Sequence, residues 1–155
     1  MIVGIDPVTT RREASQRVGA THVIDPGTDD PVARVRELTS GRGADFSFEV
    51  VGRVELMAQA VEMTRRAGTV TFVGMPPVDA VLSLPAFGTL FSGKRIVGSV
   101  MGGAQVLRDF PRFIGLAESG RLDLGSLVSS RISLEDINKG IDAAHDAEGV
   151  RTVIV

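Results

Sequence analysis

Cysteine, tryptophan and tyrosine are absent from this 155-residue sequence, and histidine occurs only twice. The absence of cysteine excludes a disulfide framework and any thiolate-bound zinc. His22 and His145 are too few, and too far apart in sequence, to indicate a metal site by themselves. We therefore assign no metal ligand to this chain.

Long apolar runs and an excess of basic residues are also missing. No run of about 18 or more apolar residues occurs, and a strand-like segment follows Met1 directly, without a charged and then apolar leader. The net charge of -2 argues against general binding to nucleic acid or to anionic membranes, since both need a basic surface. We expect a soluble, cytoplasmic protein with a small-molecule ligand.

The residues that are present predict an α/β fold with a parallel sheet. A hydrophobic content of 43% over 155 residues is enough for one globular domain. Short β-branched runs alternate with amphipathic stretches, and parallel neighbours need such a crossover, usually a helix, between them. Expected strands cover 2–5, 22–24, 46–51, 69–73, 95–99 and 150–155, with a possible edge strand at 81–84. Expected helices cover 9–18, 31–40, 54–66, 85–91, 106–119 and 133–146.

Asp6 is the first candidate for a functional residue. It stands at the carboxyl end of strand 2–5, where open α/β sheets place their ligands. A carboxylate there can accept hydrogen bonds from both hydroxyls of an adenosine ribose and would repel a 2′-phosphate, which favours NAD over NADP. The alternative is that Asp6-Pro7 is only a turn.

The segment before Asp6 is unusual for a dinucleotide-binding sheet. In such a sheet the acid follows a first strand and a glycine-rich phosphate turn by about 20 residues. Neither precedes Asp6 here, so we expect a truncated cofactor-binding half of an oxidoreductase that does not carry out the reaction alone.

Three charged residues near strand ends have two interpretations each. Arg11 and Arg12 begin a helix, and either can reach a ribose or a phosphate; the alternative is a solvated helix face. Glu49 follows a strand and resembles a catalytic acid, but a polar residue satisfied within a turn is the simpler interpretation.

Two strand ends offer backbone groups to a ligand. These are the segments Val73-Gly74-Met75 and Ser99-Val100-Met101-Gly102, which lie at the ends of expected strands. We expect their backbone amides and carbonyls to form no hydrogen bonds with a neighbouring strand. Such groups suit a carboxamide, which needs one donor and one acceptor. The alternative is that both are ordinary strand ends.

Five segments together resemble the zinc-dependent, medium-chain alcohol dehydrogenases, in order and spacing, over essentially the whole chain. The resemblance is strongest to alcohol dehydrogenases and to formaldehyde dehydrogenases linked to glutathione or mycothiol, and extends to aryl-alcohol and nitrosoaniline-dependent relatives. The segments are RVGATHVID at 17–25, DFSFEVVG at 45–52, VGMPP at 73–77, GSVMGG at 98–103 and GVRTVI at 149–154.

The resemblance implies hydride exchange between NAD and a primary alcohol or a hydroxymethyl-thiol adduct, with zinc polarising the alcohol oxygen. It places Asp6 on the adenosine ribose with Arg11 beside it, and makes Arg151 the arginine that binds pyrophosphate. The other implied cofactor contacts are Val50 and Val51 on the adenine side, and Val73, Gly74, Met75, Ser99 and Met101 around the nicotinamide. The zinc ligands of the family lie outside the matching segments, so no catalytic residue is assigned.

The resemblance also implies a domain division and an oligomer. Residues 1–100 correspond to an NAD-binding Rossmann domain without its first strand and glycine-rich turn. Residues 101–155 correspond to a segment that packs back on a catalytic domain, and the glycine pair at 102–103 is the best candidate for the boundary. Residues Val81–Leu84 resemble the edge through which two such sheets join, so we expect a homo-oligomer.

The missing strand would lie between strands 2–5 and 46–51, in the middle of the sheet. Its absence leaves two edges of about five residues without partners. Each unmade buried hydrogen bond costs about 1–3 kcal/mol, against a total stability of about 5–15 kcal/mol. We therefore expect a poorly folded or aggregation-prone chain, unless these two strand edges pair with each other or a strand of another chain pairs with both.

Two alternative functions stay open. One is a zinc-free quinone reductase relative, which would normally prefer NADP and against which Asp6 argues. The other is a non-catalytic dimerising or regulatory module that uses the edge at 81–84.

Overall fold

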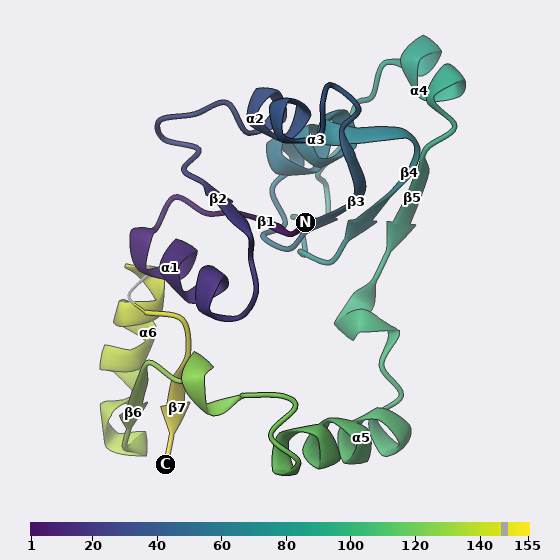
Figure 1. Cartoon of the computed structure of the whole chain (residues 1–155). Coiled ribbons are helices and arrows are strands. Elements are labelled where there is room, and N and C mark those ends of the chain that lie inside the picture. Colours follow the sequence, from purple (N-terminus) through teal and green to yellow (C-terminus); the bar gives the residue numbers. More distant parts are fainter. Residues whose placement is uncertain (147–148) are drawn as a thin grey trace. The chain divides into compact units, whose positions relative to one another are not determined.

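The computed structural model describes residues 1–146 and 149–155 and confirms an α/β fold (Figure 1). Every strand ladder among these residues is parallel. The chain divides into two compact units: unit 1 contains residues 1–27 and 105–155, and unit 2 contains residues 28–104. The chain passes from unit 2 to unit 1 between residues 104 and 105, shortly after the glycine pair at 102–103. The division into domains 1–100 and 101–155 stays a prediction.

Unit 1 contains two parallel strand pairs, each with a helix as its crossover. β1 pairs with β2 across α1, and β6 pairs with β7 across α6, which is the connection that parallel neighbours require. Its regular elements are β1 (Val3–Ile5), α1 (Thr9–Arg17), β2 (His22–Ile24), α5 (Val106–Glu118), β6 (Ser130–Ile132), α6 (Ile137–His145) and β7 (Thr152–Ile154), with short 3-10 turns at Gly125–Leu127 and Leu134–Asp136.

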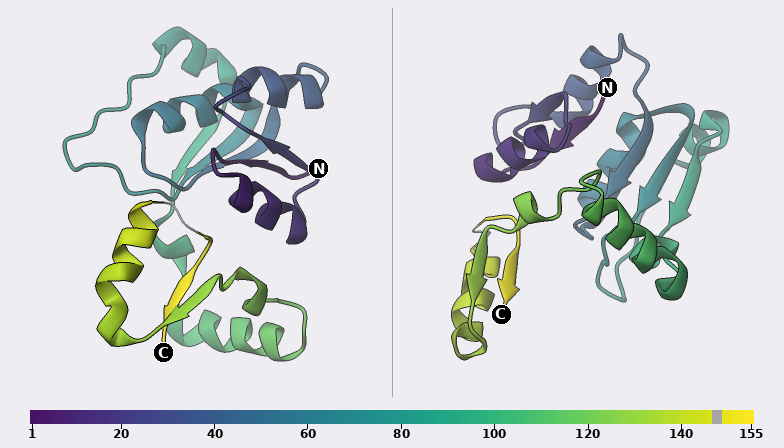
Figure 2. Two further views of the ribbon diagram at one scale, coloured as in Figure 1. Left: turned by 90° about the vertical axis from the view of Figure 1, so that its left-hand side faces the viewer. Right: turned by 60° about the horizontal axis from the view of Figure 1, so that its bottom comes forward.

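Unit 2 is a three-stranded parallel sheet in the order β3-β4-β5, with α2 and α3 against one face (Figure 2). Asp30 begins α2 as predicted, because its carboxylate accepts hydrogen bonds from the amides of Val32 and Ala33. The elements are α2 (Pro31–Leu38), β3 (Ala44–Glu49), α3 (Val54–Met63), β4 (Thr64–Phe72), α4 (Ala86–Ser92), β5 (Arg95–Gly98) and a 3-10 turn at Val100–Gly103.

The two faces of the sheet in unit 2 differ sharply in burial. Ser47 pairs with Val70, and both are buried, with Val70 fully so. Phe46 and Phe48 alternate with Ser47 along β3 and are each 66% exposed. Since successive strand residues point to opposite faces, the face that carries the two phenylalanines is uncovered in this unit.

The helix expected to run from 54 to 66 ends earlier. α3 stops at Met63, and Thr64 already pairs with Ala44 at the start of β4. The Thr64 hydroxyl lies 2.7 Å from both the Ala60 carbonyl and the Ser47 hydroxyl, which fixes the residue between helix and sheet. The ladder register then shifts before Phe46 pairs with Thr69. We infer that this tertiary hydrogen bond ends the helix.

One other expectation is corrected. Residues 81–84 form no strand, since an extended segment without a neighbouring strand has no ladder to join. Val8 is the N-cap of α1, and no side chain caps this helix end. The short strand β6 was not predicted; it gains its hydrogen bonds only by pairing with β7, which is distant in sequence.

The two strands that flank the expected gap are both edges. β1 pairs only with β2, and β3 pairs only with β4, so neither ladder among the described residues joins the two sheets. The expected tendency to aggregate stays a prediction.

The apolar stripe of α5 is partly exposed. Val106, Phe110 and Phe113 are each 49% exposed, and no residue of this helix is buried. None of the described helices is long and apolar enough to cross a membrane.

We expect Val70→Ala to lower the free energy of unfolding by about 2 kcal/mol, because it removes two methyl groups from a fully buried position in the central strand. Urea unfolding followed by circular dichroism measures the change. Val78→Ala, at a fully exposed position, is the control and should leave the midpoint unchanged. Equal midpoints for both variants would contradict this placement of the core.

Candidate functional site

Asp6 lies directly after β1 and is half-buried. Its Oδ1 accepts a hydrogen bond from the Val8 amide at 2.8 Å, so the turn interpretation of Asp6-Pro7 is confirmed. Oδ2 has no hydrogen-bond partner among the described residues. The turn and a ligand contact are therefore compatible, because Oδ1 stabilises the turn and Oδ2 is available to accept a hydrogen bond from a ligand.

Arg12 joins the loops that follow β1 and β2. Its Nη1 donates to the Asp6 carbonyl at 2.7 Å, and its Nη2 lies 2.8 Å from Asp25 Oδ2. Through these contacts the Arg12 guanidinium holds the loop that contains Asp6 in place. Arg11 and Arg12 were both candidates for a contact with the ribose or a phosphate. Arg12 positions the loop of Asp6, so Arg11 is the one available to a ligand.

Arg11 and Arg151 line one cavity of about 300 Å³ in unit 1. Arg11 Nε donates to the Gly149 carbonyl at 3.1 Å, which ties α1 to the loop before β7. Its two terminal nitrogens, and the whole Arg151 guanidinium, have no partner among the described residues. Two cationic ends without a partner among the described residues therefore line a shared cavity whose size suits a pyrophosphate.

Ser129 positions the backbone of Arg151 and was not identified from the sequence. Its Oγ accepts from the amides of Val150 at 2.6 Å and Arg151 at 3.2 Å, and its own amide donates to the Arg151 carbonyl at 2.8 Å. A serine 22 residues earlier carries no local signal of this role, because only the pairing of β6 with β7 brings it there.

In unit 2 the carboxyl ends of all three strands meet at one edge. The amides of Val73 and Gly74 donate to the Glu49 carbonyl at 2.8 and 3.1 Å, and the Ser99 amide donates to the Phe72 carbonyl at 2.8 Å. The expectation that these amides are free of a ladder is therefore wrong, because each strand adds one more bond beyond its end. The backbone of Met75 and Met101 lies farther along the loops.

Glu49 holds the turn after β3. Its Oε1 accepts from the amides of Val51 at 2.9 Å and Gly52 at 2.8 Å, and the residue is 4% exposed. Its Oε2 is buried and has no hydrogen-bond partner among the described residues. The turn interpretation is confirmed for one oxygen. The other oxygen is a buried acceptor that no local pattern in the sequence indicates.

The loops after β3 and β4 cross in direct backbone contact. A Cβ built on Gly74 would lie 2.0 Å from the Gly52 nitrogen, and one built on Gly52 would lie 2.4 Å from the Met75 carbonyl oxygen. Gly52 also has a φ of +90°, which few L-residues adopt. Both positions therefore require glycine.

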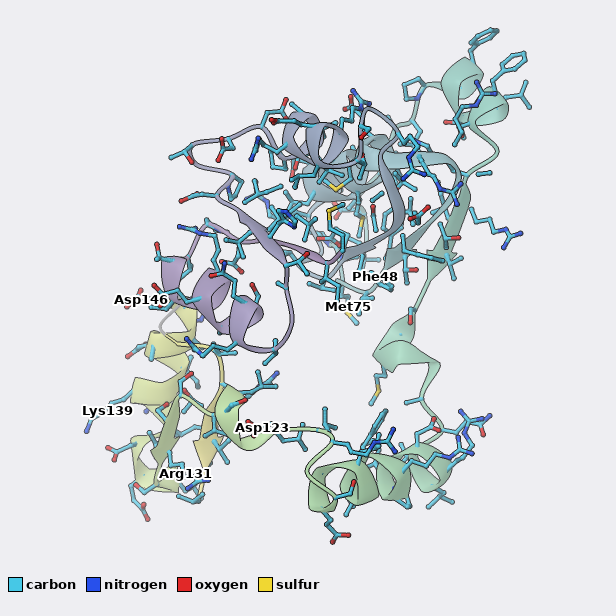
Figure 3. The ribbon with its side chains drawn as sticks, viewed as in Figure 1. Phe48, Met75, Asp123, Arg131, Lys139 and Asp146 are labelled. Atoms are coloured by element: carbon cyan, nitrogen blue, oxygen red, sulfur yellow. The ribbon has the colours of Figure 1, made fainter. Side chains whose placement is uncertain are left out.

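The apolar residues on these loops are exposed. Val50, Val51 and Met75 are 66%, 63% and 83% exposed, and Met101 is 73% exposed with a φ of +49°. Figure 3 labels Met75 and Phe48, whose side chains both project from unit 2. Exposed apolar side chains beside ordered backbone are typical of a surface that receives a planar ligand.

The predicted site residues thus fall into two groups. Asp6, Arg11 and Arg151 belong to unit 1, and the remaining predicted residues, from Val50 to Met101, belong to unit 2. In each group the side chains lie at the carboxyl ends of strands or in a cavity beside them.

Residues 1–119 match the family model described as "Zinc-binding dehydrogenase". The chain belongs to this family. It corresponds in sequence to the C-terminal part of a zinc-dependent, medium-chain alcohol dehydrogenase.

Curated relatives and solved structures agree with this family. The chain is 32% identical to "Alcohol dehydrogenase class-3" of Cereibacter sphaeroides and 32% identical to "S-(hydroxymethyl)glutathione dehydrogenase" of Paracoccus denitrificans; each match covers 100% of this chain and 43% of the relative. It is similar to the crystal structure of benzyl alcohol dehydrogenase from Acinetobacter calcoaceticus with a TM-score of 0.93 and 28% identity, over 99% of this chain and 42% of that one. The chain thus spans less than half the length of these relatives.

The described part of the chain does not fit a zinc ion. Among its residues, no group of three or more His, Cys, Asp or Glu side chains is placed to hold a metal. No step of the chemistry is therefore assigned to zinc in this chain.

We expect Gly74→Ala to destabilise the chain by about 1–3 kcal/mol, because the added methyl group would overlap the backbone of Gly52. Chemical unfolding measures the change. Gly98→Ala, at the end of β5, is the matched control, since no atom lies within 4 Å of its added Cβ. If both alanine variants unfold at the same denaturant concentration, the loops do not cross as described.

Proposed function

We propose that this chain is the cofactor-binding part of an NAD-dependent, zinc-containing alcohol dehydrogenase that acts on primary alcohols or hydroxymethyl-thiol adducts. The observation that carries the proposal is the cavity shared by Arg11 and Arg151, found in a chain of this family. Relatives named as alcohol dehydrogenase class-3 and S-(hydroxymethyl)glutathione dehydrogenase support the substrate class.

The residues of unit 1 fit the adenosine and pyrophosphate parts of NAD. The free Oδ2 of Asp6 accepts from a ribose hydroxyl, while Oδ1 keeps the turn in place through Val8. The same negative charge disfavours a 2′-phosphate, so NAD is preferred to NADP. The guanidinium groups of Arg11 and Arg151 offer paired N–H donors whose geometry matches phosphate oxygens.

The residues of unit 2 fit the planar rings of a nicotinamide dinucleotide. Val50 and Val51 offer an apolar surface to the adenine, and Val73 and Met75 offer one to the nicotinamide, where they exclude water. The Val73, Gly74 and Ser99 amides are already bonded, so the donor to the carboxamide comes from farther along these loops, at Met75 or Met101.

NAD supplies the chemistry of the reaction when bound, by accepting a hydride from the alcohol carbon. The residues described here bind and orient the cofactor, and none of them is placed to remove the alcohol proton. We therefore propose that this chain binds NAD and has no turnover by itself. The zinc of the family, and most of the substrate pocket, belong to the part of these relatives that the match does not cover.

We expect Arg151→Ala to weaken NADH binding about ten- to a hundredfold, because a charge-assisted hydrogen bond contributes about 1.5–3 kcal/mol. A titration with NADH measures the affinity through the fluorescence of the nicotinamide, and the absence of tryptophan and tyrosine leaves little protein background. Arg131→Ala, an exposed arginine on β6, is the matched control and should bind like the wild type. No measurable NADH affinity in the wild-type chain, or equal affinities in both variants, would refute the proposal.

We also propose that two copies of the chain associate through residues 81–84. The segment has no ladder partner among the described residues, and Val81 in it and Leu90 beside it are each 76% exposed. Pairing with the same segment of a second copy would satisfy its backbone and bury these side chains in an isologous interface.

Sedimentation velocity tests this association. We expect Val81→Asp to shift the chain from dimer toward monomer, because the change buries a carboxylate in the interface. Val78→Asp, at an exposed position outside the segment, should sediment like the wild type. A wild-type chain that is monomeric, or a Val81→Asp variant that is as dimeric as the control, would exclude this interface.

A further inference from the structure

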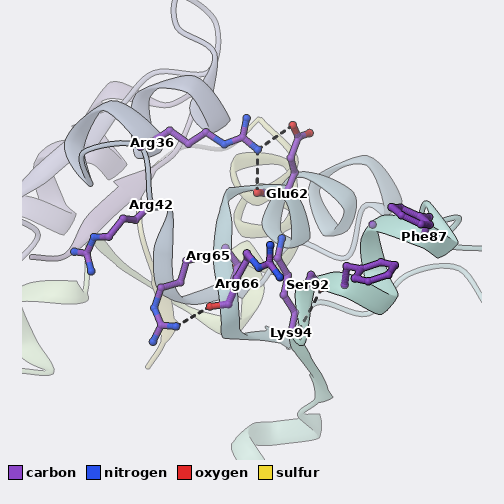
Figure 4. Close-up of a pocket in the computed structure, with 12 residues that line it drawn as sticks. Arg36, Arg42, Glu62, Arg65, Arg66, Phe87, Ser92 and Lys94 are labelled. Atoms are coloured by element: carbon purple, nitrogen blue, oxygen red, sulfur yellow. Dashed lines mark hydrogen bonds and ion pairs between the residues drawn. The ribbon is translucent and has the colours of Figure 1, made fainter.

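A second cavity lies at the opposite end of the sheet in unit 2, at the amino ends of the strands (Figure 4). It has a volume of about 850 Å³. Arg42 precedes β3, Arg65 and Arg66 lie early in β4, and Lys94 immediately precedes β5. Arg36 adds a further cation from the last turn of α2. The wall thus gathers five cationic side chains from segments far apart in the sequence.

The carboxylates nearby do not balance these cations. Glu62 is the lining carboxylate, and its Oε1 lies 3.4 Å from Arg36 Nη2, which is a long contact. Arg65 Nε lies 2.5 Å from Asp45 Oδ1. Arg42 and Arg66 have no ion-pair partner among the described residues. The cavity therefore retains a surplus of positive charge in a chain whose net charge is -2.

Lys94 is affected both by burial and by the neighbouring charges. Its Nζ donates to the Val61 carbonyl at 2.5 Å. Burial first, and then the charge of Arg36, lower the pKa of the Lys94 ammonium, while Glu62 raises it in part. A bound anion would oppose both lowering effects, because it stabilises the charged ammonium.

The volume and the lining of the cavity favour a small ligand. Its volume is within the range of about 300–1,000 Å³ that is usual for small-molecule sites. Phe87 and Phe91, with ring centroids 4.6 Å apart, line one side of it. Guanidinium groups match the oxygens of phosphate in pairs, and several around one cavity suit more than one phosphate group.

We propose that this cavity binds a small polyanion that carries two or more phosphate groups, with Arg42, Arg66 and Lys94 as its main contacts. The site is distinct from the proposed cofactor residues of this unit. Those residues follow the carboxyl ends of β3, β4 and β5, and a strand of about 4–6 residues rises roughly 13–20 Å between its two ends. The proposal does not depend on NAD binding.

The test is a titration of the full chain with inorganic tripolyphosphate, followed by isothermal calorimetry and by backbone amide shifts. We expect Arg42→Ala/Arg66→Ala to weaken binding at least about tenfold, because two charge-assisted contacts are lost. The double variant Arg53→Ala/Arg131→Ala removes the same charge from exposed positions outside the cavity and should stay within about twofold of the wild type.

Two further variants separate this site from folding defects and from the cofactor cavity. Glu62→Gln should tighten binding about two- to fourfold, since it removes the opposing carboxylate, and misfolding cannot produce a gain in affinity. Arg151→Ala should leave tripolyphosphate binding at this site unchanged, with the amide shifts centred on Gly41 and Lys94.

Three results would overturn the proposal. The first is a wild-type chain that does not bind tripolyphosphate. The second is equal weakening in the cavity variant and the charge-matched control, which would show only a nonspecific charge effect. The third is loss of binding in Arg151→Ala, which would place the polyphosphate in the cofactor cavity instead.

Discussion

The arrangement of unit 2 depends on the close crossing of two backbone segments at the carboxyl ends of β3 and β4. Gly52 and Gly74 permit this crossing, since a methyl group on either would overlap the other loop. The Glu49 carboxylate binds two amides of the first loop, and its carbonyl binds two amides of the second. One residue at the end of β3 therefore fixes the loops after β3 and β4, which carry several of the proposed cofactor contacts.

The uncovered surfaces of the two units show where further contacts are expected. β1 and β3 are edge strands, and Phe46 and Phe48 stand on the open face of their sheet. The stripe on α5 is also about half exposed. Exposed edges and faces of this kind carry unsatisfied backbone groups and apolar area, which are stabilised when another segment or another chain covers them. The chain spans less than half the length of the relatives to which it is similar.

The two ends of the sheet in unit 2 differ in chemical character. The carboxyl end presents valine and methionine side chains, whereas the amino end gathers arginines and a lysine around one cavity. The contrast arises because the helices of a parallel unit return the chain to the same end of the sheet before each strand. Residues that precede strands in the sequence, such as Arg42 and Lys94, therefore meet at one edge in space.

Local patterns in the sequence determined most elements of this protein. The periodicity of apolar residues located the strands and helices, the Asp30-Pro31 signal began α2, and five segments in register indicated the family and the proposed site residues. The tertiary structure decided what depends on contacts between distant residues. It ended α3 at Met63 through a hydrogen bond to Ser47, formed β6 by pairing it with β7, and left 81–84 without a strand. It also brought Ser129 to the backbone of Arg151 and gathered the basic cavity. A local signal cannot encode these features, because each requires a partner that only the folded chain supplies.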